Sequence, residues 1–279
     1  RTISMAMSDR EIQELERKCR SVWKRTLRMH GCLPEIRIAS SLSCVELLSV
    51  LFYGGWLRLF PGDPGAAERD RIIPSKGHGS VCLYPILADL GFFSPDLLEH
   101  PGTEGNPLTA IPSAGVGVFE TVNGSLGHGP GVGCGRAVGL RVRGNPARVI
   151  VIAGDGELSE GAVWEAVMFA GHHHLDHLYL LIDANRKSML GKCCDIMNCD
   201  HLAERFSAFG WQVFSCNGHD VAALADSFSR MFASTERKPR VLIADTVKGH
   251  GVPELEQNDI CHVLSLSPER IEELIGGAE

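Results

Sequence analysis

The chain has 279 residues, of which 44% are hydrophobic and 22% charged, and its formal net charge at pH 7 is −7. This length suffices to bury the core of one large domain, and an acidic balance without a basic run argues against nucleic acid as the main partner. No apolar stretch approaches the roughly 18 residues of a membrane-spanning helix, and no secretory signal pattern heads the sequence.

The first elements predicted along the chain are two helices. Residues 1–7 have no pattern of a folded element, and we interpret them as a leader or a cloning remnant. Ser8 and Glu11 have the spacing of a capping box, so a helix is predicted to begin there and to run to about Met29. A second, more apolar helix is predicted over residues 45–52.

Two further segments lead to the centre of the chain. A short strand near residues 71–73 is expected to turn into a helix through Ser75-Lys76-Gly77-His78. Residues 91–113 are rich in Gly, Pro, Asn, Ser and Thr and are predicted to form a long loop. Long loops in compact domains are often functional, so this loop could line the entrance to a site.

A glycine-rich turn comes next and precedes a predicted helix. Its residues are Gly124, Ser125, Leu126, Gly127 and His128. The glycines of the following helix, Gly131, Gly133 and Gly135, lower its helix propensity, and we interpret them as positions of close backbone packing. No G-x-G-x-x-G occurs in the chain, which weakens a dinucleotide-binding interpretation.

The segment Arg148–Gly191 is the most informative part of the sequence. A buried-type strand at 149–153 is followed by Gly154-Asp155-Gly156, a helix over 162–172, a strand over 178–182, and Asn185. Because parallel strands end at the same edge of a sheet, Asp155 and Asn185 are expected to approach each other. Their hard oxygen atoms suit Mg²⁺ or Ca²⁺. The glycines and the helix N-terminus near Ser159 favour a bound diphosphate.

Two clusters of Cys and His have a weaker pattern. Cys193, Cys194, Cys199 and His201 fit no zinc spacing and are interpreted as ordinary thiols. The histidines at 172, 173, 174 and 177 could place 173 and 177 on one helix face, but a solvated helix end is favoured. The 10 cysteines follow no regular framework and indicate reduced thiols, so we expect the protein in the cytoplasm.

The remaining pattern completes an α/β fold. Strands are predicted at about 211–216 and 240–246 with a helix over 220–233 between them, and Ser267-Pro268 begins a terminal helix. Strands that alternate with helices predict a mostly parallel sheet with helices on both faces. We therefore expect a single three-layer α/β domain over residues 8–279.

These motifs resemble a known family. Gly154-Asp155-Gly156 followed about thirty residues later by Asn185 is similar to the thiamine-diphosphate signature, and its surroundings resemble the N-terminal subunit of split transketolases. The resemblance implies that Asp155, Asn185 and the Lys187 carbonyl hold Mg²⁺. It also implies that the cofactor contacts Gly154, Gly156, Glu157 and the turn Gly124–Gly127.

The resemblance also implies residues at the reacting centre. His78 lies in a Ser-Lys-Gly-His motif of the family, His128 follows the turn, and His262 stands where the family has Trp-His-Gly. The chain departs from the family at Arg37, where the family has a His, as well as at Ala39, Ser40 and Asn123. An always-charged guanidinium suits a carboxylate or phosphate, so Arg37 either binds an acidic substrate or points away from a remodelled pocket.

The family pattern further implies an enzyme of two components. The pyrimidine-binding domain and its ylide-forming Glu are expected on a partner subunit, with Glu160 reaching across the interface of a heterotetramer. The expected reaction is transfer of a two-carbon ketol or acyl unit from a ketose or 2-oxo acid to an acceptor. The alternatives are a decarboxylating 2-oxo acid carboligase of specialised metabolism and a non-catalytic scaffold or regulatory homologue.

Overall fold

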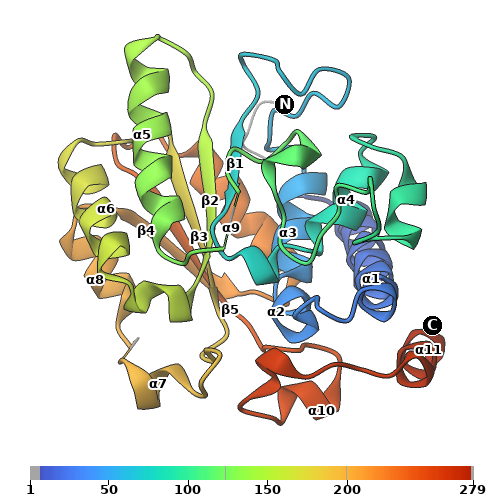
Figure 1. Ribbon diagram of the computed structural model, residues 1–279. Helices are drawn as coiled ribbons and strands as arrows, with labels where there is room; N and C mark the ends of the chain where they lie inside the picture. The colour runs from blue at the N-terminus through green and yellow to red at the C-terminus, as the bar shows by residue number, and fades with distance from the viewer. Residues whose placement is uncertain (1–6, 123, 199, 278–279) are drawn as a thin grey trace.

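A five-stranded parallel sheet forms the centre of the computed structural model, which describes residues 7–122, 124–198 and 200–277 (Figure 1). The strands lie in the order β1-β2-β3-β5-β4. Their bounds are β1 Arg71–Pro74, β2 Val149–Gly154, β3 Leu178–Ala184, β4 Gln212–Asn217 and β5 Arg240–Asp245. Residues 1–6 of the predicted leader lie outside the described part, and so do Asn123, Cys199 and the last two residues.

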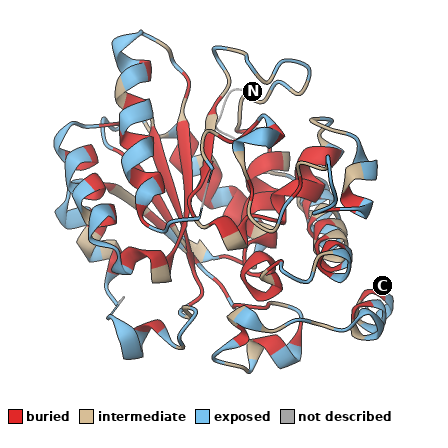
Figure 2. Ribbon diagram, viewed as in Figure 1, coloured by how far each residue is buried: buried red, intermediate tan, exposed pale blue. Residues whose placement is uncertain are grey.

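The central strands are apolar on both faces because helices cover the sheet on both sides. In β2, Ile150 and Ile152 belong to one hydrophobic cluster, while Val149 and Val151 belong to the other. This two-residue alternation follows from the pleat of a strand. Figure 2 shows the buried strands between helices whose outer faces are exposed. The sheet is thus the middle of three layers, and the predicted α/β class is confirmed.

The helices form the two outer layers, and short helices lie along the edge where the strands end (Figure 1). One layer contains α1 Asp9–Cys32, α3 Val45–Tyr53, α4 Leu83–Asp89 and α9 Val221–Ala233, and the other contains α5 His128–Val142, α6 Gly161–His172 and α8 Leu202–Ala208. The remaining helices are α2 Ile38–Leu42, α7 Cys193–Ile196, α10 Pro253–Glu256 and α11 Pro268–Gly277. No described helix is both long enough and apolar enough to cross a membrane.

Local predictions were mostly confirmed. The capping box at the start of α1 is present, since the Ser8 hydroxyl accepts from the Glu11 N–H and the Glu11 carboxylate accepts from the Ser8 N–H. Residues 91–113 contain one short 3₁₀ helix, Pro95–Glu99, and are otherwise loop. The prediction of a helix directly after β1 was wrong, because Gly77–Gly79 forms a 3₁₀ turn and α4 begins only at Leu83.

The helix glycines and the histidine run gave mixed outcomes. A Cβ on Gly133 would lie 2.7 Å from Val151, so this glycine does allow close packing of α5 on β2. Nothing lies within 4 Å of a Cβ on Gly131 or Gly135, and there the packing interpretation was wrong. Helix α6 ends at His172, and His172, His173 and His174 are exposed, as expected of a solvated helix end.

The cysteines do not form a metal cluster with His201 in the described part of the chain. Cys193 is buried, whereas Cys194 is exposed. Among the described residues, the one group of His, Cys, Asp and Glu side chains close enough to share an ion is Glu46, His219 and His250. No sequence pattern indicated this group, because its members come from three distant segments.

Candidate functional site

The edge where the strands end brings Asp155 beside the segment that contains Asn185. Asp155 directly follows β2, and Asn185 directly follows β3. The Asp155 carboxylate accepts one hydrogen bond from its neighbour Gly156 N–H at 2.8 Å and another from the N–H of Arg186. Both side chains are buried, so the approach predicted from strand order is present in the structure.

Asn185 is held in one orientation. Its Nδ2 donates to Asp183 at 2.8 Å, and its Oδ1 accepts from the Lys187 N–H at 3.1 Å. With the Asp155 carboxylate and the Lys187 carbonyl, this oxygen gives a set of hard donors of the kind that Mg²⁺ or Ca²⁺ takes. The described residues therefore fit a divalent cation at this edge.

The electrostatics of Asp155 agree with a cation site. Burial, and then the nearby charge of Asp183, raise the pKa of Asp155 to about 6. A carboxylate with a raised pKa is stabilised when a cation binds beside it, because the cation offsets both the desolvation and the repulsion. Burial and the neighbouring Asp183 carboxylate thus make Asp155 a side chain whose charged form a bound cation would stabilise.

A buried ion pair underlies the same edge and was not predicted. Lys76, which follows β1, pairs with Asp183 of β3, and Asp183 also accepts from the hydroxyls of Ser43 and Thr246. Although burial opposes its ionisation, the Lys76 ammonium keeps the pKa of Asp183 below its usual value. The pair lies beneath the candidate metal site, and Asp183 also accepts a hydrogen bond from the Asn185 side chain.

Lys248 is a second buried cation that the sequence analysis left without a role. Its Nζ donates to the carbonyl oxygens of Lys187 at 2.8 Å and Ser188 at 3.0 Å. Burial, and then the charge of Lys76, lower the pKa of Lys248 to about 8. A polar residue after each of two buried strands, Lys76 after β1 and Lys248 after β5, is the sequence signal that could have found both.

The glycine-rich turn is tied to the sheet by Glu157. This carboxylate accepts from the N–H of Gly127 at 2.8 Å, from the N–H of Gly154 at 3.4 Å, and from the hydroxyl of Ser75. Gly127 has a φ of +84°, a conformation that favours glycine. Glu157, expected to contact the cofactor, thus positions the turn, while Gly124, Ser125 and Leu126 lie exposed on its outer side.

Two predicted histidines come together. The rings of His78 and His262 meet edge to face with centroids 5.3 Å apart, and His262 Nδ1 is 3.0 Å from the Ser40 hydroxyl. Burial, and then the charge of Lys248, lower the pKa of His262 to about 3. Burial, and then Arg37, lower the pKa of His78. Both imidazoles are therefore neutral near pH 7 and available for hydrogen bonds.

The other three predicted residues lie at different places. Arg37 is the residue before α2, close enough for its charge to act on both histidines of the pair. His128 is exposed at the start of α5, where its Nδ1 donates to the Leu126 carbonyl at 3.2 Å. Glu160 is exposed at the start of α6. The described contacts do not bring His128 or Glu160 to the His78–His262 pair.

Hard oxygen ligands, a glycine-rich turn and buried lysines at the carboxyl edge of a parallel sheet define a diphosphate-binding α/β domain. Residues 39–275 match the family described as transketolase, thiamine diphosphate binding domain. The chain belongs to the transketolase family, forms its thiamine-diphosphate-binding domain, and is a transketolase-like transferase.

This chain matches some similar proteins over most of their own length and a longer one over less than half of its length. A transketolase family protein of Sinorhizobium fredii is 33% identical over 94% of both chains, and a 6-deoxy-6-sulfo-D-fructose transketolase subunit of a Clostridium species is 34% identical over 94% of this chain and 95% of its own. An apulose-4-phosphate transketolase subunit from Phocaeicola vulgatus is 35% identical over 78% of this chain and 77% of its own. The crystal structure of Campylobacter jejuni transketolase superposes with a TM-score of 0.83 at 28% identity, covering 98% of this chain but 43% of that one.

Proposed function

We propose that this chain is one subunit of a two-component, thiamine-diphosphate-dependent transketolase-like enzyme. The reaction is transfer of a two-carbon ketol or acyl unit from a ketose or 2-oxo acid donor to an acceptor. The observation that carries the proposal is the joint presence, at one edge of the sheet, of the Asp155–Asn185–Lys187 oxygen set and the His78–His262 pair.

Each group at this edge has a distinct role in the proposal. Asp155, Asn185 and the Lys187 carbonyl hold Mg²⁺, and Gly154, Gly156 and the turn ending at Gly127 hold the diphosphate. Thiamine diphosphate, when bound, supplies the carbanion chemistry that protein side chains lack.

The neutral His78 and His262 hydrogen-bond the oxygen atoms of the donor. Ser40 orients the His262 ring through Nδ1, which directs Nε2 of that ring to the substrate.

A partner subunit completes the site in this proposal. It supplies the pyrimidine-binding domain and the glutamate that drives formation of the ylide, and two copies of each subunit form a heterotetramer. The exposure of Glu160 and of the turn at Gly124–Leu126 supports an interface on this side. Two similar proteins are named as subunits of transketolases, which agrees with a divided enzyme. The 10 cysteines of the sequence follow no regular disulfide framework, so the proposal also includes a cytoplasmic location.

Arg37 supports a second candidate, a decarboxylating carboligase that acts on a 2-oxo acid. Its guanidinium acts electrostatically on both His78 and His262, so an anionic group of the donor would lie near the reacting carbons. The choice between the two is made by donor specificity. Turnover of ketose phosphates without turnover of pyruvate-like donors excludes the carboligase, and the opposite pattern establishes it.

The experiment that tests the proposal is an affinity pull-down with mass spectrometry, followed by calorimetry on the purified complex. We expect a stoichiometric partner that resembles the other half of transketolase, and tight binding of Mg²⁺ and thiamine diphosphate. Asp155→Asn should abolish this binding, whereas Asp245→Asn, the same exchange at the exposed end of β5, should not. A folded complex that binds no cofactor would instead support a non-catalytic homologue.

A further inference from the structure

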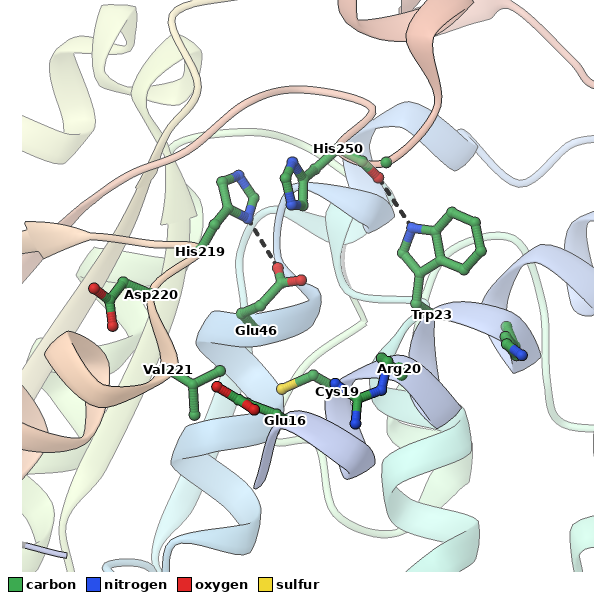
Figure 3. Close-up of a pocket in the computed structure, with 11 residues that line it drawn as sticks. Glu16, Cys19, Arg20, Trp23, Glu46, His219, Asp220, Val221 and His250 are labelled. Carbon is green, nitrogen blue, oxygen red and sulfur yellow. Dashed lines mark hydrogen bonds and ion pairs between the residues drawn. The ribbon is translucent and has the colours of Figure 1, made fainter. Parts of the chain in front are cut away.

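A second polar cluster lies in a cavity of about 670 Å³ between α1, α3 and the loops after β4 and β5 (Figure 3). Glu46 of α3, His219 of the turn after β4, and His250 of the loop after β5 meet there, with one polar atom of each within 4.8 Å of the others. None of these residues belongs to the site described above.

His219 uses both of its ring nitrogens. Its Nε2 accepts from the N–H of Val247 at 2.8 Å, and its Nδ1 lies 2.9 Å from the carboxylate of Glu46. Since a backbone N–H can only donate, Nε2 carries no proton, and Nδ1 therefore carries the proton and donates to Glu46. The His219 and Glu46 side chains are only 11% and 14% exposed, so the bond between these two side chains is partly shielded from water.

The same loop is fixed at its other end. The His250 ring stacks on the His219 ring with centroids 3.6 Å apart, and the Trp23 indole donates to the His250 carbonyl at 3.0 Å. The Glu256 carboxylate accepts from the Gly251 N–H at 2.7 Å. The segment from Val247 to Gly251 is thus held by α1, by α10 and by His219.

The consequence concerns Lys248, which follows Val247 directly. We propose that the Glu46–His219 pair positions Lys248 at the cofactor edge, by fixing the backbone from which the buried ammonium reaches the carbonyls of Lys187 and Ser188. His219 is then a positioning residue, and it acts on the site from the opposite side of the loop. The role of Lys248 toward the diphosphate rests on the proposed function, but the positioning of Lys248 does not.

A metal ion fits the three side chains less well than this arrangement. The two imidazole rings are inclined by only 21°, so their in-plane lone pairs run nearly side by side instead of converging on one point. Coordination through Nδ1 of His219 would also require the proton to move to Nε2, where the Val247 N–H already donates. Hydrogen bonding therefore accounts for the cluster, and stoichiometric binding of Zn²⁺ would contradict this account.

The test is acylation of the purified full chain with an amine-reactive reagent, followed by peptide mass spectrometry. Lys248 is 3% exposed and should react slowly in the wild type. His219→Ala should accelerate its labelling about tenfold, the effect expected when the hydrogen bonds that oppose a local opening are lost. His219→Gln, which can donate to Glu46 and accept from Val247, should restore slow labelling.

Two comparisons make the result specific. His177→Ala removes a partly exposed histidine beside Asp176 and should leave Lys248 labelling unchanged. Lys76, paired with Asp183, reports global unfolding. Unchanged Lys248 labelling in His219→Ala overturns the proposal. Equal acceleration at Lys76 and Lys248 does so too, as does protection of Lys248 by stoichiometric Zn²⁺ that depends on His250.

A second measurement separates this inference from the proposed function. Mg²⁺ with inorganic diphosphate should protect Lys248 of the wild type from labelling, and His219→Ala should raise the half-protecting concentration about tenfold. If the probe protects no lysine while the His219 variants still differ in labelling, the proposed function fails and the positioning role stands. If the probe protects equally in wild type and His219→Ala, the positioning role fails.

Discussion

Removing the Lys76 ammonium should destabilise the fold more than any exposed substitution. Lys76→Met keeps the apolar stem but leaves Asp183, which has no exposed surface, with neutral donors only, from Ser43, Thr246 and Asn185. Breaking one side of a buried pair costs about 3–5 kcal/mol. Because each kcal/mol lowers Tm by about 2–4 °C in a domain approaching this size, we expect Tm to fall by roughly 6–20 °C.

The pH dependence gives this prediction a sign. In the wild type, the pKa of Asp183 is below its usual value, so the pair stabilises the fold above the unfolded pKa and loses this effect as pH falls through the folded pKa. Without Lys76, burial raises the pKa of Asp183 above the unfolded value, so the penalty is complete at neutral pH and fades on acidification. The difference in free energy of unfolding between the wild type and Lys76→Met should therefore become smaller as pH falls.

Urea unfolding followed by circular dichroism, at neutral and mildly acidic pH, measures both effects. The double variant Lys76→Met/Asp183→Asn should recover part of the lost stability, because it removes the uncompensated charge. A loss below about 1 kcal/mol at neutral pH, the value of an exposed pair, would refute the reasoning. A difference in free energy of unfolding between the wild type and Lys76→Met that grows as pH falls would also refute it.

Three further predictions concern the site. Gly129→Ala places a Cβ 2.2 Å from Ser75 and should cost about 1–3 kcal/mol in urea unfolding, whereas Gly135→Ala, with open space around its Cβ, should be neutral or slightly stabilising. Diphosphate binding by the wild type, measured by calorimetry, should weaken as pH rises above about 8, where Lys248 loses its charge; a Lys248→Arg variant, if it binds, should stay pH-independent in this range, and equal pH dependence would contradict the assignment. Arg37→Gln should raise KM for anionic donors at least about tenfold with less effect on kcat, and an unchanged KM would show that the side chain points away from the substrate.

The sequence was most informative where function depends on neighbouring strands. Asp155 and Asn185 follow two buried strands that are adjacent along the chain, so strand order alone brings them to one edge. The oxygen atoms of their side chains are the basis of the proposed metal site. His78 was assigned from a motif of the family, but its pairing with His262 depends on the path of the loop after β5, which no local pattern describes.

The interactions that the sequence did not reveal are those between distant segments. The partners Lys76 and Asp183 are 107 residues apart, and His219 and Glu46 are 173 apart. A lysine or a histidine at a strand end has the same local pattern whether its partner is water, a ligand or another side chain. Glu157 illustrates the point, because the resemblance implied a cofactor contact but no local pattern indicated the hydrogen bonds that its carboxylate accepts from Gly127 and Ser75.

The contact between the Lys248 ammonium and the Lys187 carbonyl has a consequence for how the site is loaded. The Lys248 ammonium already donates to the Lys187 carbonyl, one of the oxygens proposed for the metal, so a binding metal ion must displace it. The displaced ammonium then needs a new anionic neighbour, which a diphosphate provides. Metal and diphosphate should therefore enter as thermodynamically coupled ligands, each binding more tightly in the presence of the other.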